Sequence, residues 1–138
     1  EGARIRPPDP LGGKLGCQMV RSIAEKYPGA RLMAVGTNSA AAAAMAKAGA
    51  HQAAAGENPL IVACRKADII IGPIGIVIAD SLFGEITPAM AVAVAQSDAV
   101  RILLPVNRCG NIVAGVQELS LTALISDAMA KLEGVMQE

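Results

Sequence analysis

The sequence predicts an α/β domain in which helices cover both faces of a mostly parallel sheet. Strand-like and helix-like patterns alternate along the whole chain, as parallel strands with covering helices require. Between Asp68 and Asp80 lie eleven uncharged residues that begin Ile69-Ile70-Ile71, which is typical of a central strand buried on both faces. A chain of 138 residues fits one domain, residues 1–138. Five strand and helix units of this kind predict a Rossmann-like domain with three layers and the strand order 3-2-1-4-5.

After a first strand at residues 4–8, which the pattern of five units requires, the first half of the chain predicts two helices and two more strands. Two prolines in residues 4–8 are unsuited to a central strand, so the start of the chain, residues 1–10, is expected to be irregular. Apolar residues with a period of four predict a helix over residues 15–27. A strand over residues 31–36 precedes an alanine-rich helix over residues 39–48, which Thr37 or Asn38 caps. A weak strand at residues 51–54 completes this half.

Cap-and-proline pairs mark the helices of the second half. Asn58 followed by Pro59 predicts the start of a helix that runs to about Lys66, and Thr87 followed by Pro88 predicts a helix through about Ser97. Strands are expected at residues 69–71 and 101–105. Ser120 is expected to cap the last helix.

A ligand site is expected where the chain reverses its direction across the sheet. In the order 3-2-1-4-5, the loops after the first and fourth strands flank one crevice. Glycines at a helix start let backbone N–H groups approach a phosphate, although they also serve tight turns and close helix packing. The residues expected to contact a ligand there are Gly12, Gly13 and Gly16 from the first loop, and Gly72, Pro73 and Gly75 from the second.

The end of the second strand argues against ordinary NAD as the cofactor. An acidic residue usually binds the adenosine ribose at this position, and the chain has Thr37, Asn38 and Ser39 instead. Their hydroxyl and amide groups suit a phosphate, or they serve only to cap the helix. A nucleotide therefore remains a candidate ligand.

Candidate catalytic residues follow the last two strands. Asp80 and Glu85 are carboxylates suited to acid or base chemistry, or to a solvated turn, and Asn107 is placed to orient a substrate. The single histidine, His51, belongs to the third unit, away from the expected crevice, so a catalytic triad is not expected. The residues leave open whether the protein is an enzyme.

Composition excludes several other classes of function. Twelve Lys and Arg balance twelve Asp and Glu, and aromatic residues make up 1% of the chain, so nucleic-acid binding is not expected. No apolar run approaches the length of a membrane span, and the start lacks a secretory signal, so a cytoplasmic location without membrane contact is expected. Three widely spaced cysteines and one histidine predict no metal site.

Two helical segments lack charge and predict self-association. Residues 86–97 and 39–46 contain no charged side chain, and a helix that is apolar all round must be covered on every side. One small domain cannot easily bury both, so a homo-oligomer is expected, unless the mildly apolar alanine surface is tolerated in a monomer.

Several segments resemble an uncharacterised family of short bacterial Rossmann-like proteins that is known only as a domain of unknown function. The resemblance covers about residues 12–130 and is strongest over residues 72–88, GPIGIVIADSLFGEITP. It implies the fold and brings no reaction or substrate with it. Shorter matches lie at residues 34–39, 48–50, 56–59 and 105–107.

The sequence thus predicts a domain that binds a nucleotide or another small anionic ligand across the Gly12 and Gly72 loops. The alternative is a non-catalytic homo-oligomeric scaffold or interaction module.

Overall fold

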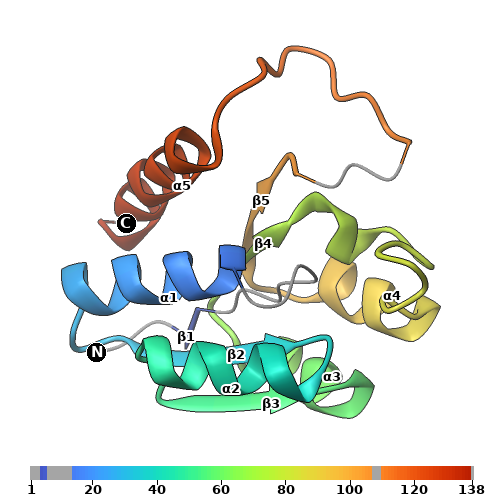
Figure 1. Ribbon diagram of the computed structural model, residues 1–138, viewed down its shortest axis with the longest axis horizontal. Coiled ribbons are helices and arrows are strands. Elements are labelled where there is room, and N and C mark those ends of the chain that lie inside the picture. The colour runs from blue at the N-terminus through green and yellow to red at the C-terminus, as the bar shows by residue number, and fades with distance from the viewer. Residues whose placement is uncertain (1–3, 6–13, 107–109, 138) are drawn as a thin grey trace.

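The computed structural model describes residues 4–5, 14–106 and 110–137 and has a mixed α/β fold with parallel strands (Figure 1). The helices are α1 (Lys14–Lys26), α2 (Ser39–Ala48), α3 (Glu57–Lys66), α4 (Pro88–Gln96) and α5 (Leu121–Met136). The strands are β1 (Arg4–Ile5), β2 (Arg31–Gly36), β3 (Gln52–Ala55), β4 (Ile69–Pro73) and β5 (Val100–Leu104), and a 3-10 turn, η1 (Ile74–Val77), follows β4. The predicted alternation of strands and helices is therefore confirmed.

The strands form two parallel groups. One group has the order β1-β2-β3, and the other pairs β4 with β5, with Ile69 opposite Val100 and Pro73 opposite Leu104. Cα atoms of β1 also approach those of β4 within 8 Å, so the two groups are neighbours. The α/β class predicted by the sequence is confirmed at this level.

Side chains of β4 alternate between two hydrophobic cores. Ile69 and Ile71 pack with buried residues of α1, α2 and α5, whereas Ile70 packs with buried residues of α3 and α4. Successive side chains of a strand point to opposite faces, so each face receives isoleucine. Burial of each isoleucine contributes about 1.5–3 kcal/mol, which explains why this strand has no polar position.

Three of the predicted helix caps are confirmed. The side chain of Asn38 accepts a hydrogen bond from Ala41 N at 2.9 Å. The corresponding bonds are 3.2 Å from Met90 N to Thr87 Oγ1 and 3.1 Å from Ala123 N to Ser120 Oγ. Each bond satisfies an amide that has no partner inside its helix.

The predicted cap of α3 is wrong. The helix begins at Glu57, its N-cap is Gly56, and Asn58 lies exposed in the first turn. Gly56 has φ 106, a conformation that side chains other than glycine rarely adopt. The glycine therefore lets the chain enter the helix earlier than the Asn58-Pro59 pair predicts.

Strand boundaries differ from the prediction by one or two residues. The expected strand 69–71 extends to Pro73, because Gly72 and Pro73 remain paired with Leu103 and Leu104. The strands expected at 51–54 and 101–105 are each shifted by one residue. Arg4–Ile5 form β1, and the remainder of the start expected to be irregular lies outside the described residues.

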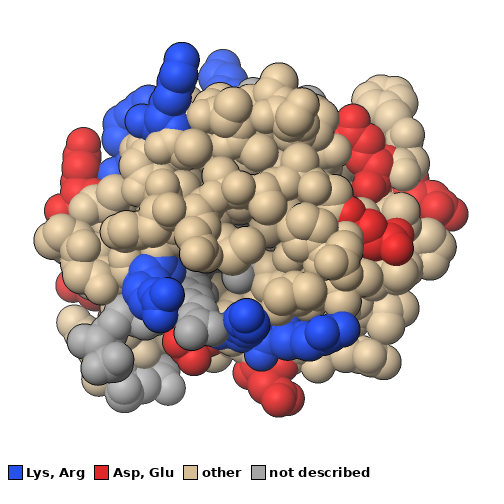
Figure 2. Space-filling model, turned by 90° about the horizontal axis from the view of Figure 1, so that it is seen from below, with Lys and Arg blue, Asp and Glu red and all other residues tan. Residues whose placement is uncertain are grey.

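Charged side chains are unevenly distributed over the surface. Seen from the side on which α2, β3 and α3 lie, Lys, Arg, Asp and Glu surround a broad uncharged area (Figure 2). None of the helices in the described ranges has both the length and the apolar character needed to cross a membrane.

Candidate functional site

The structure describes part of the predicted ligand site. Thr37 and Asn38 form the turn between β2 and α2, and Ser39 is the first residue of α2. Gly16 is buried in the first turn of α1. Gly12, Gly13 and Asn107 lie outside the described residues.

Tight packing shapes the turn between β2 and α2. A Cβ atom on Gly36 would lie 2.7 Å from Ala42 N and 2.9 Å from Asn38 O, so only glycine fits there. Asn38 has extended backbone angles and caps the helix through its side chain. The capping role that the sequence allowed for Asn38 is therefore observed, and its amide oxygen is already engaged.

Among the residues that the structure describes, the hydroxyl of Thr37 has no hydrogen-bond partner. In the described part of the chain, Thr37 Oγ1 is buried and makes no hydrogen bond. A buried polar group without a partner costs about 1–3 kcal/mol. The atom lies beside the amino terminus of α2, where the first amides of the helix favour negative charge.

The Gly72 loop is closed by the chain that follows it. Gly72, Pro73 and Gly75 are buried, the first two within β4 and the third in η1. The carbonyl oxygen of Gly75 accepts hydrogen bonds from Ser81 Oγ at 2.5 Å and from Ile78 N at 3.0 Å. These residues thus contribute to close backbone packing. Because they are buried, they are not exposed to a ligand in the expected crevice.

The predicted carboxylates lie on a turn before α4 in which several residues have left-handed backbone angles. Asp80 and Glu85 are exposed, and Asp80 N donates to Ile86 O at 2.7 Å. Positive φ angles occur at Asp80 (65), Leu82 (60) and Phe83 (56). Phe83 is fully exposed at this turn. The sequence predicts Asp80 and Glu85 as candidate residues, but it contains no signal for the strained backbone that leaves Phe83 exposed.

His51 lies at the opposite end of β2 from Thr37. Its Nδ1 atom accepts a hydrogen bond from Leu32 N at 3.1 Å, and its own backbone N–H donates to Leu32 O at 2.8 Å. Leu32 is the second residue of β2, whereas Thr37 follows its last residue. The histidine therefore helps to anchor the edge strand and is not positioned beside the turn that carries Thr37.

A cavity of about 450 Å³, which the sequence does not predict, lies beside His51. The cationic side chains of Arg31 and Lys66 line it together with Gln52. These residues come from β2, β3 and the end of α3, so no local sequence pattern links them.

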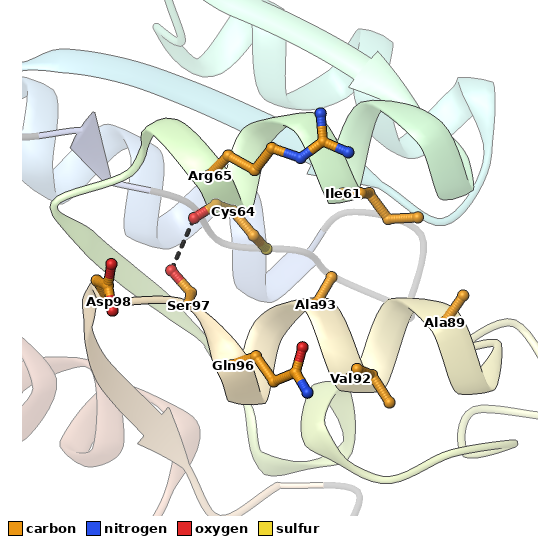
Figure 3. Close-up of a pocket in the computed structure, with 9 residues that line it drawn as sticks. All are labelled: Ile61, Cys64, Arg65, Ala89, Val92, Ala93, Gln96, Ser97 and Asp98. Atoms are coloured by element: carbon orange, nitrogen blue, oxygen red, sulfur yellow. Dashed lines mark hydrogen bonds between the residues drawn. The ribbon is translucent and has the colours of Figure 1, made fainter.

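A second cavity, of about 520 Å³, lies between α3 and α4. Figure 3 shows α3 and α4 side by side, with Ile61 and Ala89 toward one end of the groove and Arg65 and Asp98 toward the other. The uncharged sequence of residues 86–97 indicated an apolar surface here, but it did not indicate which helix forms the opposite wall. The remaining residues that line this groove are Cys64, Val92, Ala93, Gln96 and Ser97.

Metal-binding side chains do not converge in the described ranges. No group of three or more His, Cys, Asp or Glu residues there has an arrangement that could hold an ion. The chemistry available at the β2–α2 turn is therefore that of hydroxyl and backbone amide groups.

The comparisons with known proteins identify a family and nothing closer. Neither the curated proteins nor the solved structures contain a significant match to the chain. One family model matches residues 5–137, almost the whole sequence, and its description is "Domain of unknown function (DUF3842)". The chain belongs to this family, as the resemblance over residues 72–88 predicted.

Proposed function

We propose that the protein binds a nucleotide or another small anionic ligand at the end of the sheet where β2 runs into α2. The observation that carries this proposal is the buried hydroxyl of Thr37, which has no partner in the described part of the chain. It adjoins the amino end of a ten-residue helix, where backbone N–H groups favour negative charge. A phosphate or carboxylate oxygen would accept the hydrogen bond that Thr37 does not otherwise make.

A Rossmann-like arrangement is part of the same proposal. The neighbouring positions of β1 and β4 support a single sheet ordered 3-2-1-4-5, with its helices in layers on both faces. In that order a ligand is expected beyond the carboxyl ends of the strands, where β2 runs into the β2–α2 turn. The burial of Gly72 and Gly75 favours ligand contact on the side of Thr37.

Catalysis would require Asp80, Glu85 or Asn107 to reach the bound ligand. Asp80 and Glu85 are exposed on the turn before α4 and are free to act on a ligand only if it extends to that turn. The binding proposal does not depend on such a step. We also propose that the protein is located in the cytoplasm.

A thermal-shift experiment tests ligand binding. Wild-type protein is heated with NAD, NADP, FMN, ATP, S-adenosylmethionine or inorganic phosphate, and with buffer alone. A ligand at a hundred times its dissociation constant stabilises the folded state by about 2.7 kcal/mol, which raises the midpoint by about 5 to 10 °C in a domain of this size. Loss of that shift in Thr37→Val, but not in Thr37→Ser, would assign the binding to the hydroxyl. No shift with any of these ligands would contradict the proposal for the classes tested.

Self-association is the second candidate function. The observation that favours it is the surface of α4, where Ala89 and Val92 remain exposed on a helix without a charged residue. Native mass spectrometry at high protein concentration measures this directly. A monomer throughout would exclude a homo-oligomeric scaffold.

A further inference from the structure

Hydrogen bonds at both ends hold α3 and α4 side by side. At one end, Thr87 Oγ1 donates to Glu57 Oε2 at 2.5 Å. At the other end, Ser97 Oγ donates to the carbonyl oxygen of Cys64 at 2.7 Å (Figure 3). The two helices therefore run in the same direction, and the groove between them is formed before any partner binds.

Apolar side chains occupy the middle of this groove. Ile61 lies near the midpoint of the segment between Glu57 and Cys64, and Val92 lies midway between Thr87 and Ser97. The two side chains are thus at about the same level along the helices. Val92 is 50% exposed and Ile61 is partly exposed, so both apolar side chains at the middle of the groove remain accessible to solvent.

Charge changes sign along the exposed side of α3. Glu57, Ile61 and Arg65 are spaced by four residues, which places them on one face of the helix in the order acid, apolar, base. Glu57 and Arg65 are exposed. Within residues 14–106 and 110–137, Arg65 makes no ion pair or hydrogen bond.

We infer that a second copy of this chain packs on the α3–α4 face, antiparallel, about a two-fold axis at the level of Ile61. This inference rests on the proposed self-association and is independent of the ligand proposal. A two-fold contact requires a surface that complements itself. Because Glu57 and Arg65 are equally spaced from Ile61, each Arg65 then meets Glu57 of the partner subunit, and the pair forms twice.

The second charged residue of the groove fits the same arrangement. Asp98 is exposed beyond the carboxyl end of α4 and also has no ion pair or hydrogen bond in the described ranges. The antiparallel arrangement brings it toward the amino end of the partner's α4, where negative charge is favourable. A parallel two-fold arrangement would instead bring Glu57 toward the end of the partner's α4 near Glu85, with like charges together and helix dipoles aligned.

The size of the face sets the strength expected of the contact. A helix of ten residues is about 15 Å long, and two helices side by side span about 20 Å, so their projected footprint is roughly 300 Å² per copy. Stable complexes bury about 800 Å² per partner. The face is therefore smaller than that of a stable complex, and the expected dimer is weak.

Two charge reversals and their mixture test the arrangement. Sedimentation velocity is measured up to about 200 µM for wild type, for Arg65→Glu and for Glu57→Lys, followed by native mass spectrometry of the two variants mixed. Each variant alone places like charges together twice, so its dimer dissociation constant should rise roughly tenfold or more. In the mixture both contacts join opposite charges, so a heterodimer should form about as strongly as the wild-type dimer.

Matched controls lie on the exposed side of α1, a helix that packs on a different hydrophobic core from α3 and α4. Arg21→Glu and Glu25→Lys make the same charge changes at exposed positions and should leave the wild-type dimer intact. Val92→Asp, which introduces charge at the middle of the groove, should abolish the dimer without relying on the hydrogen bond of Glu57. Circular dichroism confirms that each variant is folded.

The outcomes distinguish whether the protein self-associates from where its interface lies. A wild-type monomer at 200 µM would exclude self-association altogether. A wild-type dimer that persists in Arg65→Glu and Val92→Asp would place the interface elsewhere and overturn this inference alone. A dimer lost in both charge variants but not restored by mixing them would overturn the antiparallel pairing.

Discussion

The hydroxyl of Ser81 donates a hydrogen bond to the carbonyl oxygen of Gly75, and the two residues are both buried. This bond ties the turn before α4 back to η1. Ile86 N also donates to Ser81 O at 3.2 Å, so the turn closes on itself. The segment between β4 and α4 is thus a compact connection, and its residues Asp80, Phe83 and Glu85 are exposed on the turn.

Replacing Ser81 should loosen this connection. Ser81→Ala removes the donor to Gly75 O, while Ile78 N continues to donate to the same oxygen. The expected loss of unfolding free energy is about 1 kcal/mol, or a midpoint lower by about 2 to 4 °C in thermal denaturation. Ser39→Ala, at an exposed serine, is the control and should change the midpoint little. Equal effects of the two substitutions would contradict the structural role of Ser81.

Phe83 should be replaceable with a gain in stability. Its φ of 56 lies in the left-handed region, which costs an ordinary side chain about 1–2 kcal/mol, and its ring is fully exposed. Phe83→Asn should therefore raise the midpoint, because asparagine tolerates this conformation. Phe83→Val should lower it, because β-branched residues tolerate it poorly. Thermal denaturation at low protein concentration compares the monomers.

Gly36 should not accept even the smallest side chain. The Cβ of Gly36→Ala would approach two backbone atoms of the β2–α2 turn closer than 3.0 Å, so the turn must shift. The expected destabilisation is about 1–3 kcal/mol by urea denaturation. Gly29→Ala is the matched control, since no described residue other than its chain neighbours lies within 4 Å of the added Cβ, and it should be neutral or slightly stabilising. If Gly36→Ala were as stable as Gly29→Ala, the turn would be less rigid than described.

The Thr37 hydroxyl should lower the stability of the ligand-free protein. Thr37→Val removes a buried oxygen that has no partner in the described ranges, and it keeps the shape of the side chain. The unfolding free energy should therefore rise by about 1 kcal/mol, measured without ligand in urea. Thr37→Ser keeps the hydroxyl and serves as the control. A destabilised Thr37→Val would show that the hydroxyl is satisfied in the folded state.

Local signals predicted most of the element boundaries. Asn38, Thr87 and Ser120 were predicted as helix caps because a cap depends on the few amides that follow it. Asn58 was predicted incorrectly, since Gly56 could adopt φ 106 and start α3 earlier. The prediction of a strand buried on both faces at β4 is confirmed. The strand is two residues longer than predicted, because Gly72 and Pro73 also pair with β5.

The candidate site was predicted less completely than the fold. The sequence singled out Thr37 and its neighbours, but an unpartnered hydroxyl becomes visible only when the surrounding atoms are known. It could not indicate that Gly75 would be covered by Ser81, or that His51 would bond to Leu32. The groove between α3 and α4 also joins residues that are about thirty positions apart.

By itself the sequence determined the alternation of strands and helices, the uncharged surface of α4 and the family to which the chain belongs. These properties depend on hydrophobic period, capping and composition, which act over a few residues at a time. Only the tertiary structure decided which turn was buried, which hydroxyl lacked a partner and which helices formed a groove. Those properties depend on contacts between distant segments, and a local pattern cannot specify such contacts.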